Sequence, residues 1–184
     1  MTTNIPNLLT LSRILLIPFL AIFLYFIDNR SNDLVCATLF AIACFTDFLD
    51  GYLARTYSIQ SKLGALLDPI ADKLLVSVVI LILVAKGKVD ILPSLAIICR
   101  EILVSGLREF LATLKVKMPV SRAAKFKTGI QMFALFVLVL GNRGAGVEWV
   151  DLVGNLFLWL AAILTIGTGY VYFRKTLDSL GNKQ

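Results

Sequence analysis

Long stretches of apolar residues without any charge constrain this chain more than any other feature of its sequence. Residues 14–26 and 74–85 contain no charged side chain. A helix needs roughly 20 mostly apolar residues to cross a bilayer, and six segments meet this requirement: about 8–27, 34–54, 66–86, 91–111, 125–141 and 149–173. Six spans leave little of the 184 residues for a soluble domain. We therefore expect one all-α integral membrane domain over residues 1–184.

The amino-acid composition agrees with this expectation and excludes several kinds of site. Charged residues make up 16% of the chain, against about 25% in soluble domains. The chain has no histidine, which excludes a histidine base, a phosphohistidine intermediate and histidine-bound zinc. Its three cysteines, Cys36, Cys44 and Cys99, fall inside predicted spans, so neither a disulfide framework nor a cysteine metal site is expected.

The positive charges favour one orientation of the six predicted spans. With an even number of spans both termini lie on one side of the membrane. That side carries ten of the basic residues in the connections and termini, and the other side carries four. Short cytoplasmic loops are enriched in lysine and arginine. We therefore predict that both termini are cytoplasmic.

Four aspartates gather where the second predicted span ends and the third begins. Asp47 and Asp50 are three residues apart, and Asp68 and Asp72 are four residues apart. Either spacing places both carboxylates on one face of a helix, about 5–6 Å apart at Cβ. A short cytoplasmic connection joins the two helices, so we expect them to be antiparallel neighbours whose carboxylate pairs face each other.

Four carboxylates at one place near hydrocarbon require compensating charge. An ionised aspartate at the centre of a span costs about 2.5–3.5 kcal/mol on insertion scales, and repulsion between the carboxylates adds to this. Arg55 and Lys73 cannot neutralise four charges. Hard oxygen ligands suit Mg²⁺ or Mn²⁺, and two such ions would balance the site. The alternative, that the aspartates only cap helix ends or pair with nearby bases, explains one aspartate better than two facing pairs.

The residues around these aspartates match a known pattern. The order Asp-x-x-Asp-Gly-x-x-Ala-Arg, eight further residues and Gly-x-x-x-Asp-x-x-x-Asp resembles the signature of the CDP-alcohol phosphotransferases. All eight positions of that signature are present, and they are Asp47, Asp50, Gly51, Ala54, Arg55, Gly64, Asp68 and Asp72. Three looser motifs, at 4–13, 100–109 and 125–131, resemble the members of the family that make phosphatidylglycerol phosphate.

The resemblance implies a reaction and its requirements. CDP-diacylglycerol and sn-glycerol 3-phosphate would give phosphatidylglycerol phosphate and CMP, with Mg²⁺ or Mn²⁺ as cofactor. It also implies a homodimer surrounded by membrane lipids in the plasma membrane of a bacterium. The orientation predicted from the basic residues makes its active site face the cytoplasm. No nucleic-acid partner is expected.

The resemblance also assigns roles to individual residues. It makes Asp47, Asp50, Asp68 and Asp72 metal ligands, and Asp72 also the base that takes the proton from the attacking glycerol hydroxyl. Gly51, Ala54, Arg55 and Gly64 would border the CDP-diacylglycerol. Because the acceptor carries a phosphate, a second basic site is expected. Its candidates are Arg13, Arg100, Arg108, Lys125 and Lys127.

Three other functions are compatible with some of these features. A sibling enzyme could use another acceptor, such as serine, inositol, inositol phosphate or phosphatidylglycerol, although the extra basic residues favour a phosphorylated one. A membrane prenyltransferase also uses aspartates and magnesium, but its motifs lie in two separated regions of a longer chain. A divalent-cation transporter usually binds its ion near the midplane between structural repeats. Here the aspartates lie toward one face and no repeat is found.

Overall fold

The computed structural model describes residues 4–57, 62–113 and 122–181, which form six α-helices and no strand. The helices are α1 (Asn4–Phe26), α2 (Arg30–Tyr57), α3 (Lys62–Ala85), α4 (Ile91–Thr113), α5 (Arg122–Ala145) and α6 (Val150–Gly181). Each of the six predicted spans coincides with one helix. The prediction of an all-α chain with six helical segments is therefore confirmed.

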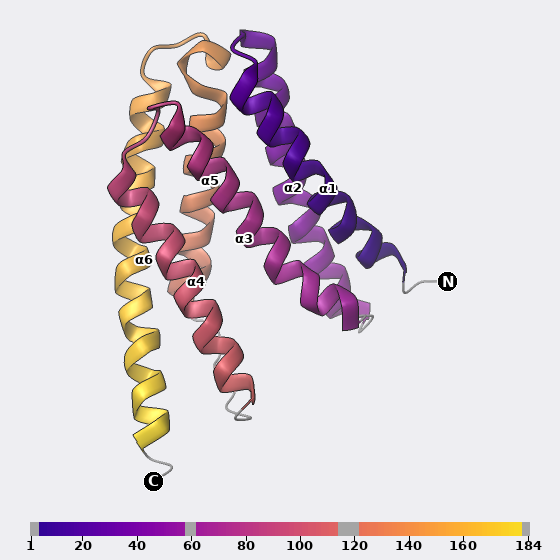
Figure 1. The fold of residues 1–184 in the computed structure, drawn as a ribbon, viewed down its shortest axis with the longest axis vertical. Helices are drawn as coiled ribbons and strands as arrows, with labels where there is room; N and C mark the ends of the chain where they lie inside the picture. Colours follow the sequence, from indigo (N-terminus) through magenta and orange to yellow (C-terminus); the bar gives the residue numbers. More distant parts are fainter. Residues whose placement is uncertain (1–3, 58–61, 114–121, 182–184) are drawn as a thin grey trace.

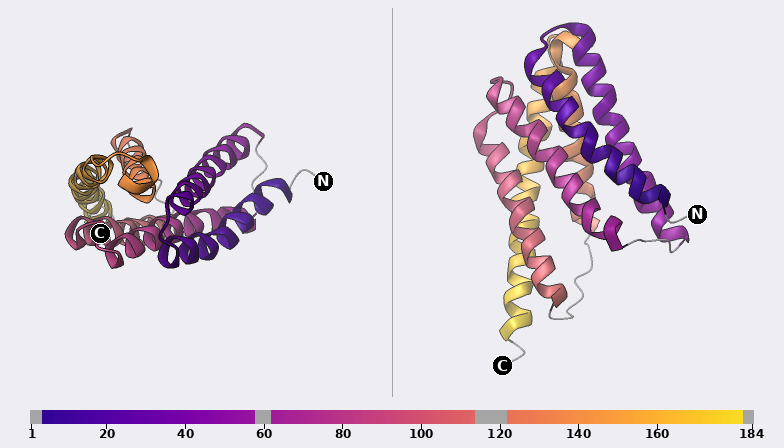
Figure 2. Two further views of the ribbon diagram at one scale, coloured as in Figure 1. Left: turned by 90° about the horizontal axis from the view of Figure 1, so that it is seen from above. Right: turned by 45° about the vertical axis from the view of Figure 1, so that its right-hand side comes forward.

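The helices run alternately up and down (Figures 1 and 2). α1, α3 and α5 begin toward the lower end of Figure 1, where α2, α4 and α6 end. The two ends of the described chain therefore lie toward the same end of the molecule. This end also holds the carboxyl-terminal part of α2 and the first turns of α3, which carry the predicted aspartates.

Apolar side chains fill the centre of the bundle and also cover much of its outside. The most extensive packing is between α5 and α6, and α1 packs against both α2 and α3. Phe40, Ile80 and Leu135 are completely buried in the core. Large apolar side chains such as Phe19 and Ile163 nevertheless point outward. A surface rich in exposed apolar side chains is what a lipid-facing bundle presents.

Two helical stretches in the described part of the chain are long and apolar enough to cross a membrane, Lys125–Ala145 and Val150–Arg174. A shorter apolar stretch covers Thr10–Phe26. Together with the apolar outer surface, these stretches indicate a helical membrane protein.

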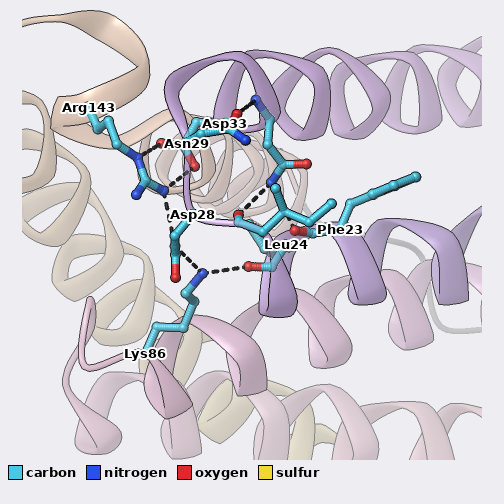
Figure 3. A network of polar contacts seen from close by, with 9 residues as sticks. Phe23, Leu24, Asp28, Asn29, Asp33, Lys86 and Arg143 are labelled. Carbon is cyan, nitrogen blue, oxygen red and sulfur yellow. Dashed lines mark hydrogen bonds and ion pairs between the residues drawn. The ribbon is translucent and has the colours of Figure 1, made fainter.

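Charged side chains join the helices at the end opposite the aspartates (Figure 3). Arg143 of α5 donates two hydrogen bonds to Asp33 of α2, with Nε–Oδ2 and Nη2–Oδ1 distances of 2.6 and 2.9 Å. Asp28, between α1 and α2, accepts from Lys86 at 2.7 Å and from Arg143 at 3.1 Å. Lys86 also donates to the backbone carbonyl of Leu24. This network ties α1, α2, α3 and α5 together.

The helical backbone of α5 breaks at Gly141, which has φ 61° and ψ 175°. This left-handed φ favours glycine. A Cβ atom here would lie 3.1 Å from Lys88 Nζ and 3.2 Å from Asp151 Oδ1. The predicted span 125–141 thus ends at the kink, and the helix continues beyond it to Ala145.

Candidate active site

The predicted carboxylates come together through α1. Asp47 lies on α2, whereas Asp68 and Asp72 lie on α3. α1 packs extensively against both α2 and α3. The expected antiparallel arrangement of α2 and α3 is observed, and α1 supplies the side chains that link their aspartates.

Arg13 of α1 connects the two helices that carry the aspartates. Its Nη1 atom donates to Asp47 Oδ1 at 2.8 Å and to Asp72 Oδ1 at 3.1 Å. The Arg13 side chain is only 1% exposed, while those of Asp47 and Asp72 are 39% and 40% exposed. The guanidinium thus lies behind the carboxylates, and the carboxylates keep an accessible edge.

Thr10 makes the corresponding contact with the third described aspartate. Its hydroxyl, one turn before Arg13, donates a hydrogen bond to Asp68 Oδ1. Thr10 is buried and Asp68 is partly exposed. Thr10 and Arg13 therefore contact Asp47, Asp68 and Asp72 from a single face of α1.

Two of the predicted acceptor residues meet at a different carboxylate. Lys127 of α5 and Arg100 of α4 both donate to Glu101 Oε1, the latter at 3.3 Å. Arg100 also donates to Thr168 of α6 at 3.3 Å, and its guanidinium lies 5.9 Å from the ring centroid of Tyr172. These contacts join α4, α5 and α6 in one polar cluster that carries more positive than negative charge.

The chain matches known proteins over most of its length. The model of the CDP-alcohol phosphatidyltransferase family matches residues 3–167. The chain belongs to this family. The family predicted from the signature is thereby confirmed.

Curated relatives within the family share one name. A protein of Rickettsia typhi is 53% identical over 171 residues, which cover 93% of this chain and 96% of the relative. A protein of Pseudomonas fluorescens is 44% identical over 93% of this chain and 89% of its own. One of Cereibacter sphaeroides is 35% identical over the full length of both. All three are named CDP-diacylglycerol–glycerol-3-phosphate 3-phosphatidyltransferase.

Part of the family signature lies outside the described side chains. Asp50, Gly51, Ala54 and Arg55 belong to the last turns of α2, but their side chains are outside the described part of the structure. Gly64 is buried in the first turn of α3. The structure therefore places three of the four predicted metal ligands against one face of α1. The roles of the residues predicted to bind the nucleotide stay predictions.

The donor set at the family signature fits a hard divalent cation. Every candidate ligand there is a carboxylate, and oxygen ligands suit Mg²⁺ and Mn²⁺. Enzymes of this family are generally dependent on divalent metal. Among the residues whose side chains are described, no group of three or more acidic, cysteine or histidine side chains has an arrangement that could hold a metal ion. Asp50 lies outside that set, so the ligands remain a prediction.

The predicted acceptor residues of this family member differ in exposure. Arg108 and Lys125 are exposed, Arg100 is mostly buried, and Lys127 is completely buried. Arg13, the fifth candidate, lies against the signature aspartates instead of with the other four.

Neither Thr10 nor Glu101 was among the site residues predicted from the sequence. One signal pointed toward Glu101: Arg100 and Lys127 are basic residues in predicted spans, and ionisable groups in spans usually have partners. Thr10 could have been found only from its spacing of three residues before Arg13, which places both side chains on one helix face.

Proposed function

We propose that this chain transfers the phosphatidyl group of CDP-diacylglycerol to sn-glycerol 3-phosphate, giving phosphatidylglycerol phosphate and CMP. The observation that carries the proposal is the similarity to relatives of this name, such as the Rickettsia typhi protein at 53% identity over 93% of the chain. The complete eight-position signature and the convergence of Asp47, Asp68 and Asp72 on α1 support it.

Asp47, Asp50, Asp68 and Asp72 would hold two divalent ions, Mg²⁺ or Mn²⁺. When bound, such ions neutralise charge on a pyrophosphate and on the leaving nucleotide. The carboxylates themselves would repel the phosphates, so they act on the substrate only with the cations in place. The accessible edges of Asp47 and Asp72 are consistent with this role.

Asp72 would also act as the base. It takes the proton of a glycerol 3-phosphate hydroxyl while that oxygen forms a bond to the phosphorus of the phosphatidyl group. The bond from this phosphorus to the oxygen of CMP breaks, and CMP leaves. In a chain without histidine a carboxylate is a reasonable group for this transfer. Arg13 holds this carboxylate by donating a hydrogen bond to its Oδ1 atom at 3.1 Å.

CDP-diacylglycerol would lie beside the carboxyl-terminal turns of α2 and the first turn of α3. Gly51, Ala54 and Gly64 are small residues that let a ligand approach the backbone closely. Arg55 would contact the diphosphate of the nucleotide. The acyl chains would extend along the apolar outer surface of the bundle.

The phosphate of the acceptor would bind the basic residues of α4 and α5. Arg108 and Lys125 are exposed and can reach a ligand directly. Arg100 and Lys127 add positive charge from within the bundle, where Glu101 holds them. Arginine suits a phosphate because its planar group can donate two parallel hydrogen bonds.

We further propose six membrane-spanning helices with both termini in the cytoplasm. The excess of basic residues on the side of the termini supports this orientation. It gives the carboxylates access to cytosolic glycerol 3-phosphate. The bacterial relatives support a location in the plasma membrane, and a homodimer surrounded by lipid is proposed from the family resemblance.

A comparison of acceptors tests the proposed function. Purified protein in mixed micelles receives CDP-diacylglycerol and Mg²⁺ with equal concentrations of glycerol 3-phosphate, serine, inositol phosphate or phosphatidylglycerol, and CMP release is measured. We expect release with glycerol 3-phosphate to exceed release with any other acceptor at least tenfold. Faster release with another acceptor would assign the chain to a sibling activity.

A further inference from the structure

We propose that α1 orients the candidate metal ligands: Thr10 positions Asp68, and Arg13 positions Asp47 and Asp72. The inference rests on the proposed function, because it concerns the carboxylates that would hold the cations. It assigns a role to two residues outside the family signature, and it gives Arg13 a role other than binding the acceptor phosphate.

The first observation is that both side chains point into the protein at the site. Thr10 is 1% exposed and Arg13 is 2% exposed. They are three residues apart on α1, a spacing that places them on the same helix face. A threonine hydroxyl and a guanidinium are costly to bury unless they are hydrogen-bonded. Here their bonds go to the signature aspartates.

The second observation is the division of the carboxylates into an inner and an accessible side. Arg13 is almost entirely covered, whereas Asp47 and Asp72 each keep about two fifths of their side chain exposed. An acceptor molecule arriving at the exposed edges would meet the aspartates before Arg13. This arrangement suits a group that holds the carboxylates from behind better than one that binds incoming phosphate.

The third observation is that α1 supplies the link between the two halves of the signature. Asp47 and Asp72 belong to different helices, and both bind one nitrogen atom of Arg13. Hydrogen bonds to ligating carboxylates fix their orientation, and removing such a partner typically costs about 10- to 100-fold in metal affinity or activity. The relative placement of the carboxylates therefore depends on residues about 35 to 60 positions away in sequence.

The Thr10 contact gives the sharper test, because valine has almost the shape of threonine without its hydroxyl. The experiment measures Mn²⁺ binding to purified protein in detergent by the electron paramagnetic resonance of free Mn²⁺. We expect Thr10→Val to weaken binding by about 10-fold or more, and Thr10→Ser, which restores a hydroxyl, to recover most of the affinity. The matched control is Thr176→Val, because the buried hydroxyl of Thr176 bonds only to the carbonyl of Tyr172 in its own helix among the described contacts.

The outcomes separate this inference from the proposed function. If the unmodified protein binds no Mn²⁺, the proposed metal site itself is wrong. If it binds Mn²⁺ and Thr10→Val binds equally well, α1 does not position Asp68 and the inference is overturned. If Thr176→Val weakens binding as much as Thr10→Val does, the effect is a general loss of packing, which also overturns the inference.

Arg13 is tested by separating the two kinetic constants. We expect Arg13→Ala to lower kcat at least tenfold at saturating metal while the KM for glycerol 3-phosphate stays within about threefold, because the carboxylates are misplaced but the acceptor site is intact. A rise in the KM for glycerol 3-phosphate of tenfold or more, with kcat unchanged, would show that Arg13 binds the acceptor phosphate and would overturn its positioning role. The Mn²⁺ measurement on Thr10→Val keeps the inference testable if Arg13→Ala does not fold.

Discussion

Lys127 of α5 and Glu101 of α4 form an ion pair in which the lysine side chain is only 1% exposed and the glutamate 24% exposed. Removing one partner of a buried pair leaves the other charge without compensation, which typically costs about 3–5 kcal/mol. We therefore expect Glu101→Gln to lower the free energy of unfolding by about 3 kcal/mol, since the glutamate keeps some exposure. Unfolding of the purified protein in detergent measures this change.

Two further variants identify the cause of that loss. Glu109→Gln makes the same chemical change at an exposed position of α4 and should leave the stability nearly unchanged. The double variant Glu101→Gln with Lys127→Met removes both charges and should be more stable than Glu101→Gln alone. A double variant as unstable as the single one would show that the buried charge is not the cause.

The network at the opposite end of the bundle allows a comparison of two aspartates bound to the same arginine. Asp33 is buried, with its side chain 2% exposed, and it accepts two hydrogen bonds from Arg143. We expect Asp33→Asn to lower the free energy of unfolding by about 2 kcal/mol, because bonds to charged groups are worth about 1.5–3 kcal/mol. Thermal unfolding in detergent is the measurement.

Asp28→Asn is the matched control, since Asp28 is exposed and binds the same arginine. Its hydrogen bonds from Lys86 and then from Arg143 lower the pKa of this carboxyl below its ordinary value of 3.8. A lowered folded-state pKa stabilises the protein above the ordinary pKa, and this stabilisation is lost as pH falls through the lowered value. At neutral pH the substitution should cost much less than Asp33→Asn, and an equal cost would contradict the importance of burial here.

Arg108 and Arg55 should affect the two substrates differently. Arg108→Ala removes an exposed arginine from the proposed acceptor side. We expect it to raise the KM for glycerol 3-phosphate about 10- to 150-fold, the equivalent of a lost charged hydrogen bond if KM follows binding. Arg55→Ala should instead raise the KM for CDP-diacylglycerol. Initial rates against each substrate, with the other saturating, measure both effects.

Arg108→Lys is the control for the assignment of Arg108 to the acceptor phosphate. It restores the charge without the planar donor group, so it should recover only part of the affinity. If Arg108→Ala changes only the dependence on CDP-diacylglycerol, the acceptor phosphate must be sought at Lys125 and Lys127.

The orientation in the membrane is tested by labelling single cysteines in a variant without the natural ones. A cysteine replacing Lys117, between α4 and α5, should react with impermeant reagents only from the cytoplasm. One replacing Val147, an exposed residue between α5 and α6, should react only from outside. The reverse pattern would overturn both the orientation and the access of the site to cytosolic glycerol 3-phosphate.

The sequence predicted the helices well because each of them contains one long apolar stretch. It predicted their ends less well. α6 continues to Gly181, beyond the predicted end near 173, and α2 begins at Arg30 instead of near 34. Hydropathy marks only the apolar part of a helix, whereas backbone hydrogen bonding continues into its polar turns. α5 likewise continues to Ala145, past the predicted end at 141, although its backbone breaks at Gly141.

The candidate site was predicted only as far as local spacing allows. Asp47, Asp68 and Asp72 could be identified because their separations are fixed by helix geometry and by the family signature. The contacts that join them could not, because Arg13 lies 34 residues before Asp47 and 59 before Asp72. Such contacts depend on which helices pack together, and nothing in the local sequence indicated that α1 would pack against both α2 and α3.

The most direct measurement of the central claim is the identity of the lipid product. Purified protein and its Asp68→Asn variant are incubated with CDP-diacylglycerol, glycerol 3-phosphate and Mg²⁺, and the lipids are analysed by mass spectrometry. The unmodified protein should form phosphatidylglycerol phosphate and CMP in equal amounts, only when glycerol 3-phosphate and the metal are present. Asp68→Asn keeps the shape of the side chain but not its charge, and should lose nearly all of this activity while remaining folded. No phosphatidylglycerol phosphate from the unmodified protein, or near-normal formation by Asp68→Asn at saturating Mg²⁺, would contradict the claim.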